Sequence, residues 1–266
     1  MTNSCVTLTD LPDEILLMIC QKLTNFDVIY CLKGLHRRID RIIHDSIFTS
    51  HLSFVKWTKN GFLDRLHCDI VHRRYCLQIL PSIHDRIKWL DLEVSSMKQI
   101  LCAAYYPSLN SLGLYNIDEE SIRFLSTAQN LSSEVFETQI TTLTVSLNEN
   151  EQNEEIYESR ARIFHSIFVV FKRLTTLIVD QSLYQKLVRL CLTDEPLLTH
   201  FRSSTLLQLT INVQCFDDCL SLLDGRFPSL HTLDVELANM YCSNEISNQG
   251  DLPNLKRLSI SCTFET

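Results

Sequence analysis

The sequence predicts a mixed α/β protein in which a short N-terminal helical hairpin precedes an irregular solenoid of repeats with a parallel sheet. Two patterns lead to this prediction. A helix-start signal near the N-terminus is followed by apolar residues at helical spacing. Behind it, one short leucine pattern occurs seven times along the chain. We therefore expect a helical unit over residues 1–48 and a repeat domain over residues 49–266.

The first helix is expected to start close to Leu11. Asp10 can act as its N-cap, and Pro12 suits the first helical turn. Carboxylates at Asp13 and Glu14 suit the positive end of the helix dipole. One apolar stripe runs along this helix and is formed by Ile15, Leu16, Ile19 and Leu23.

A second helix is expected after the polar break at residues 24–27, which also supplies its cap. The two helices form a hairpin of about fifty residues, and so short a chain buries too little surface to be stable alone. The hairpin is thus expected to pack on the following domain or on a partner. The apolar positions of the second helix are Val28, Leu32, Leu35, Ile39 and Ile42.

The repeated pattern is an apolar residue, two variable positions, Leu, one variable position, and then Leu, Val or Ile. Its central leucines lie 22, 31, 34, 32, 24 and 25 residues apart, near or beyond the roughly 20 to 29 residues of leucine-rich repeats. Pro107, Pro228 and Pro253 place a non-helical corner before three of the copies. Each strand buries alternate side chains, so only stacked units complete a core. The central leucines are Leu90, Leu112, Leu143, Leu177, Leu209, Leu233 and Leu258.

The segments between the copies are expected to be partly helical, with helices over residues 119–125, 159–171 and 216–223. A further strand is predicted over residues 51–57, followed by a helix over residues 62–80 that joins the hairpin to the array. In this arrangement the parallel sheet forms the concave side of the solenoid.

The composition excludes several classes of protein. A net charge of −8 argues against a nucleic-acid partner. The longest central apolar stretch, residues 163–171, is too short to cross a bilayer, so no membrane association is expected. The N-terminus shows no secretory signal. The 11 cysteines are odd in number and scattered through apolar patterns, which predicts reduced core residues in a cytoplasmic or nuclear protein.

No enzymatic chemistry is expected of this chain. Its 5 glycines spell neither nucleotide-binding fingerprint, and a nucleophile elbow and a zinc-protease helix are missing from the sequence. Cys68, His72 and Cys76 share one face of a predicted helix, but a structural zinc site usually draws four ligands from separate elements. We therefore expect neither a bound metal nor another cofactor.

The N-terminal residues resemble the F-box, the docking motif of substrate receptors in Skp-cullin-F-box ubiquitin ligases. The resemblance covers about residues 8–43 and rests on Leu11-Pro12-Asp13-Glu14-Ile15 with the apolar positions behind it. It implies an F-box protein with leucine-rich repeats that binds a Skp-type adaptor, and through it a cullin ligase. The region at residues 34–39 departs from the family because the Trp of its Cys-Arg-x-Trp-like element is missing. The resemblance assigns adaptor binding to Leu11, Pro12, Ile15, Leu16, Ile19, Leu23, Asp27, Val28 and Leu32.

The repeat pattern also defines a row of outward-facing positions on the expected concave sheet. Carboxylates outnumber basic residues there, and two aromatic side chains can serve as anchors of the kind found at interface centres. This face is expected to bind a protein substrate with a partly basic surface. A hydroxyl-rich strand face without a partner is the competing interpretation. The predicted substrate-binding residues are Trp89, Asp91, Glu93, Tyr115, Asp180, Asp234 and Glu236.

A second interpretation treats the hairpin as a cap on the solenoid, because the open ends of repeat arrays need covering. The two interpretations differ in one respect. A cap buries the stripe of Ile15 and Ile19 against the first repeat, whereas a docking motif leaves it accessible. At the other end, the last strand has no visible capping helix behind it, so we expect a partner, self-association or an incomplete chain.

Overall fold

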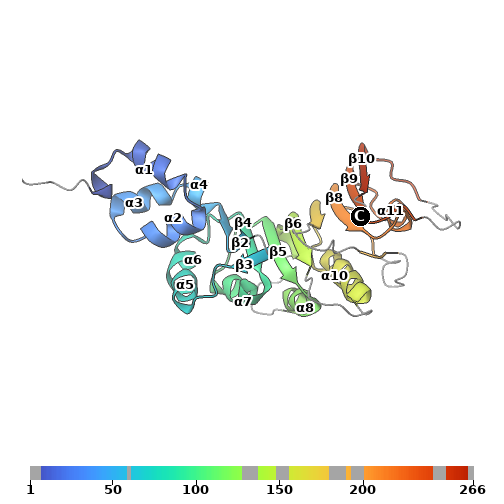
Figure 1. Cartoon of the computed structure of the whole chain (residues 1–266), viewed down its shortest axis with the longest axis horizontal. Coiled ribbons are helices and arrows are strands. Elements are labelled where there is room, and N and C mark those ends of the chain that lie inside the picture. The colour runs from blue at the N-terminus through green and yellow to red at the C-terminus, as the bar shows by residue number, and fades with distance from the viewer. Residues whose placement is uncertain are drawn as a thin grey trace, which may run out of the picture.

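The chain forms a mixed α/β structure around an eight-stranded parallel sheet. The computed structural model describes residues 7–58, 61–127, 137–147, 156–179, 190–192, 201–241 and 250–262. Figure 1 shows an elongated molecule with a helical unit at one end and the last strands at the other. The strands are β1 (His51–Ser53), β4 (Trp89–Glu93), β5 (Ser111–Ile117), β6 (Thr142–Leu147), β7 (Thr176–Val179), β8 (Gln208–Val213), β9 (Thr232–Leu237) and β10 (Arg257–Cys262).

The strands of this sheet lie in chain order, so each inner strand pairs with the one before it and the one after it in the sheet, and β1 and β10 form the two edges. All seven copies of the leucine pattern form strands of this sheet, as the sequence predicts. Helices cover one face of it, and Figure 1 shows α7, α8 and α10 side by side below the strands. These helices are α7 (Val94–Ala103), α8 (Glu119–Thr127), α10 (Ile156–Val170) and, further along, α11 (Phe216–Leu222).

Neighbouring units are joined by a repeated hydrogen-bond pattern at the corner before each strand. The carbonyl oxygen of one corner residue accepts two backbone N–H groups from the next unit, at 2.8–3.1 Å. These hydrogen bonds have the same geometry at each corner although the loops between units differ in length, because the bonds join backbone groups alone. The accepting corner residues are Ser50, Lys88, Asn110, Thr141, Thr175, Leu207 and His231.

The helical unit contains more helices than the predicted hairpin. It comprises the turn η1 (Leu8–Asp10) and the helices α1 (Asp13–Cys20), α2 (Asn25–Leu32), α3 (Arg37–Ile43) and α4 (Ser46–Thr49). The prediction of a single second helix was wrong, because Gly34 has a φ of 84° and ends α2. A new helix then starts at Arg37, where the ring of His36 accepts a hydrogen bond from the N–H of Arg38 at 3.2 Å.

The caps of these helices follow the sequence in part. Thr24 caps α2 as predicted, since its hydroxyl oxygen accepts from the N–H of Asp27 at 3.2 Å. Asp10 does not cap α1. Its carboxylate instead accepts hydrogen bonds from the N–H and hydroxyl of Thr7, at 2.8 and 2.7 Å, and stabilises the preceding turn.

The segment between the helical unit and β4 differs from the prediction. The predicted strand over residues 51–57 is interrupted at Phe54 and divides into β1 and β2 (Val55–Thr58), and β2 pairs antiparallel with β3 (Gly61–Asp64). The predicted helix over residues 62–80 therefore begins later, as α5 (Asp69–Arg74). It continues through the π-helical turn η2 (Tyr75–Ile79) into α6 (Leu80–Ile83). The π-helical turn precedes Pro81, whose nitrogen has no hydrogen to donate to the carbonyl of Leu77.

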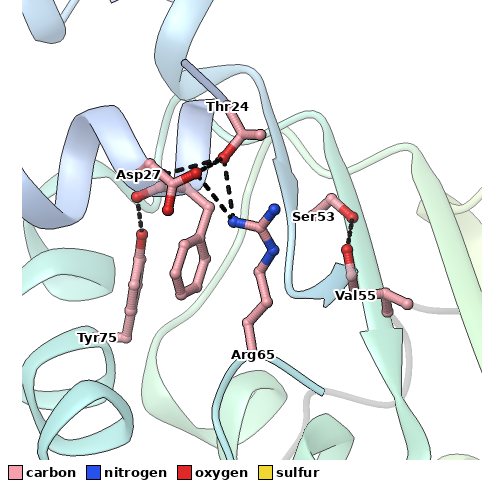
Figure 2. A network of polar contacts seen from close by, with 7 residues as sticks. Thr24, Asp27, Ser53, Val55, Arg65 and Tyr75 are labelled. Atoms are coloured by element: carbon pink, nitrogen blue, oxygen red, sulfur yellow. Dashed lines mark hydrogen bonds and ion pairs between the residues drawn. The ribbon is translucent and has the colours of Figure 1, made fainter. Parts of the chain in front are cut away.

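The helical unit is fixed to the sheet by aromatic packing at α2. The ring of Phe26 stacks on Tyr75 with centroids 4.6 Å apart, and Phe54 meets both rings edge-on at 5.7 and 5.0 Å. The Tyr75 hydroxyl donates to the Phe26 carbonyl at 2.6 Å. Figure 2 draws this bond as the dashed line from the hydroxyl of Tyr75. Phe26 and Ile29 thereby belong to the same hydrophobic core as the strands.

Three arginines that follow β3 in the sequence add polar contacts to this junction. Arg65 donates to the Thr24 hydroxyl at 3.1 Å and pairs with Asp27 at 3.3 Å (Figure 2). Arg74 lies over the ring of Tyr30, 4.9 Å from its centroid. The carbonyl groups of Lys33 and His44, at the C-terminal ends of α2 and α3, accept from Arg74 and Arg86 respectively. Cations suit these carbonyl ends of helices.

Within the described ranges, no helix has the length and hydropathy needed to span a membrane.

We expect Tyr75→Phe to lower the free energy of unfolding by about 1 kcal/mol, because it removes a buried hydrogen bond while keeping the ring. Denaturant unfolding followed by circular dichroism measures this change. Tyr105→Phe is the matched control, since Tyr105 is 58% exposed. Equal stability of the two variants would contradict the assigned role of the Tyr75 hydroxyl.

Candidate functional site

One face of α1 carries apolar side chains that remain accessible. Ile15, Met18, Ile19 and Leu23 are 41%, 59%, 42% and 47% exposed. The spacing of Ile15, Met18 and Ile19 by three and four residues places them together on one side of the helix, and Leu23 follows beyond its last residue, Cys20. The opposite side of α1 is buried through Leu16 and Cys20, so the exposed stripe is additional to the residues that hold the helix in place.

A shallow apolar groove lies beside this stripe. It encloses about 370 Å³ of empty space, part of which is open to solvent. Burial raises the pKa of the Cys20 thiol, which keeps this side chain neutral at physiological pH. The groove therefore offers apolar contacts only. Its lining residues are Leu8, Leu16, Ile19, Cys20, Leu23, Leu32, Ile39 and Ile42.

The predicted adaptor-binding residues fall into two groups. Pro12, Ile15, Ile19 and Leu23 are exposed, whereas Leu11 and Leu32 are half-buried. Leu16 and Val28 are buried at 3% and 0% exposure, so they support the surface from below. Asp27 points to the junction, where it pairs with Arg65. Met18 was not among the predicted residues of the stripe, although its spacing of three residues from Ile15 places it on the same side of the helix.

The second candidate surface is the sheet face opposite α7, α8 and α10, here named the open face. It carries His51, Trp89 and Asp91 on the first two strands. The carboxylate of Asp91 accepts a hydrogen bond from the indole N–H of Trp89 at 2.7 Å and contacts His51 Nε2 at 2.8 Å. The rings of His51 and Trp89 lie 4.9 Å apart with an interplanar angle of 32°. These contacts fix the indole in one orientation.

Asp91 and Tyr115 were expected to be exposed, and this expectation was wrong, since both are 7% exposed. The reason lies in Gly113, which pairs with Asp91 on the neighbouring strand. A β-carbon at Gly113 would be 2.3 Å from Asp91 Oδ1 and 3.0 Å from Tyr115 Cε2. Both side chains therefore lean into the space that glycine leaves. Asp91 is covered, and Trp89 and His51, which it contacts, lie between it and the solvent.

Glu93 has a structural role in addition to its place on the open face. Its carboxylate accepts from the N–H of Ser95 at 2.8 Å and so caps the N-terminus of α7. It also bonds the Ser95 hydroxyl, and its other oxygen accepts from Asn116 Nδ2 at 3.3 Å. Asn116 has a φ of 57°, the left-handed conformation that asparagine tolerates.

The predicted carboxylates at the other end of the open face are more accessible. Asp234 and Glu236 on β9 are half-buried. Asp234 Oδ1 lies 3.6 Å from a guanidinium nitrogen of Arg257 on β10. Asp180, also predicted to bind substrate, lies outside the described residues.

The cysteine-histidine pattern on α5 and η2 gives one contact. Cys76 Sγ lies 3.4 Å from His72 Nε2, while Cys68 is the exposed residue before α5. Among the residues that the structure describes, no group of three or more His, Cys, Asp or Glu side chains could hold a metal ion.

Comparison of the sequence with protein-family models and with curated proteins gives no match.

We expect Gly113→Ala to displace the Asp91 carboxylate and break its bond to the indole of Trp89, because the added methyl group overlaps Asp91. Crowding of this kind typically lowers stability by about 1–3 kcal/mol. Denaturant unfolding measures the loss, and the chemical shift of the Trp89 indole N–H reports the broken bond. Ser111→Ala, on the same strand and face, is the control; an unchanged indole signal in Gly113→Ala would count against this geometry.

Proposed function

We propose that this chain is a protein-interaction adaptor that docks a Skp-type protein through α1 and holds a protein substrate on the open face. In this role it is the substrate-recognition subunit of a Skp-cullin-F-box type ubiquitin ligase, with the helical unit as its F-box and the strand array as its leucine-rich repeats. The ubiquitin-transfer chemistry belongs to the partners. The cytoplasm or the nucleus is the compartment in which such a complex would act.

The observation that carries the proposal is the exposure of Ile15 and Ile19 at 41% and 42% beside an apolar groove. Exposing an apolar side chain to water costs roughly 25 cal/mol of free energy for each Å² of its surface. A contiguous stripe of this kind typically marks a surface that a partner covers. Its position on the Leu-Pro-Asp-Glu-Ile segment supports the Skp-type adaptor as that partner.

The alternative is a repeat-containing interaction protein whose helical unit is only a cap, unrelated to ubiquitin transfer. One observation favours it in part, because Phe26 and Ile29 of α2 do close the end of the sheet core. Capping by α2, however, does not cover the stripe on α1. Since one helix packs on the sheet core and the other exposes apolar side chains, this arrangement supports docking in addition to capping.

Ile15→Asp is expected to abolish co-purification with a Skp-type adaptor, because a carboxylate in the apolar contact would be desolvated without a partner. Pull-down from a co-expression of both proteins measures the loss. Asp234→Ala on the open face is the control and should retain the adaptor. Circular dichroism establishes that the Ile15→Asp chain is folded, as expected for an exposed position.

Failure of the folded wild-type chain to bind any Skp-type adaptor would contradict the docking role. The capped interaction protein would then be the better explanation. Retention of the adaptor by Ile15→Asp would contradict the assignment of the surface to α1.

A further inference from the structure

We propose that the open face binds a cationic side chain, an arginine or lysine of the protein substrate, over the indole ring of Trp89. This inference rests on the open face being the substrate surface of the proposed function. The preference for a basic partner would then depend on one contact, between the fixed ring of Trp89 and a cation.

The indole of Trp89 is already held in one orientation by its neighbours. Its N–H is bonded to Asp91 at 2.7 Å, and the ring of His51 packs beside it with centroids 4.9 Å apart. A partner therefore does not have to order this side chain on binding, which reduces the entropic cost of the contact. The face of an indole attracts cations more strongly than the other aromatic rings do.

The neighbourhood of the ring leaves room for an incoming group. Along the sheet, Trp89 is next to Ser111, and Asp91 is next to Gly113. Ser111 is small, so the side of the indole away from His51 faces a low side chain, whereas the space over Gly113 is taken by Asp91 and Tyr115. The following residues of the same row, Thr142 and Thr176, are also short.

The charge around the ring favours a cation over an anion. Asp91 lies at the N–H edge of the indole, and Glu93 follows two residues later on the same face of the strand. Both carboxylates are already hydrogen-bonded, Asp91 to Trp89 and His51 and Glu93 to Ser95. The partners of Glu93 are neutral donors, which fix its position and leave its negative charge in place, so this carboxylate attracts a guanidinium or ammonium group near the ring.

Nuclear magnetic resonance of the full chain tests the inference directly. The chain has 2 tryptophans, so labelling with ¹⁵N-tryptophan gives two indole signals, and Trp57→Phe assigns them. The probes are two blocked tripeptides, Gly-Arg-Gly and Gly-citrulline-Gly, because citrulline keeps the shape of arginine without its charge. We expect the Trp89 signal to shift in proportion to site occupancy with the arginine peptide and to remain unchanged with the citrulline peptide.

Two glutamate variants provide a matched comparison. Glu93→Gln keeps an oxygen that can cap α7 and removes the charge, so it should weaken binding of the arginine peptide roughly two- to fivefold. Glu236→Gln removes a charge from β9, about 24 Å away across five strand spacings, and should leave this binding unchanged.

Equal shifts with both peptides would overturn the inference, since recognition would then not depend on charge. An unchanged Trp89 signal with the arginine peptide would overturn it as well. Neither result affects the adaptor test on Ile15, which lies in the helical unit. Failure of this inference is thus distinguishable from failure of the proposed function.

Discussion

The position of the helical unit depends on the packing of Phe26 against Tyr75 and Phe54. These three rings bring together α2, the segment after β1 and the π-helical turn η2. Since none of the three elements is longer than 8 residues, each would be unstable alone. Their mutual burial, together with the hydrogen bond from Tyr75 to the Phe26 carbonyl, converts them into one core that continues into the sheet.

This junction determines which helix faces are left for a partner. α2 buries Phe26 and Ile29 toward the sheet and Val28 toward the rest of the helical unit. α1 buries Leu16 and Cys20, and its Leu17 packs against the core of the helical unit. The stripe of Ile15 and Ile19 consequently faces outward although it is as apolar as the buried side. Because α2 supplies Phe26 and Ile29 to the core of the sheet, this stripe on α1 is not needed to hold the helical unit in place.

The sheet could be predicted from the sequence because its determinant is local and repeated. Leu90 and Leu112 occupy the same position of the pattern as the central leucines of the later copies, and they are paired in register on neighbouring strands. The breaks in the N-terminal part could not be predicted in this way. The end of α2 depends on the left-handed conformation of Gly34, and the division of the first strand depends on Phe54, whose burial is decided by residues far along the chain. Helical periodicity alone cannot distinguish a continuous helix from two helices joined at a glycine.

The two ends of the open face show why residue type alone did not identify the accessible carboxylates. Leu90-Asp91-Leu92-Glu93 and Leu233-Asp234-Val235-Glu236 have the same pattern and occupy the same register of the sheet. Asp91 is buried because Gly113 leaves space beside it and because Trp89 and His51 supply donors. Asp234 has Thr210 and Ser259 as its neighbours and one guanidinium at 3.6 Å. The same motif therefore orients an aromatic ring on β4 and presents a carboxylate on β9, and the difference comes from residues on the adjacent strands.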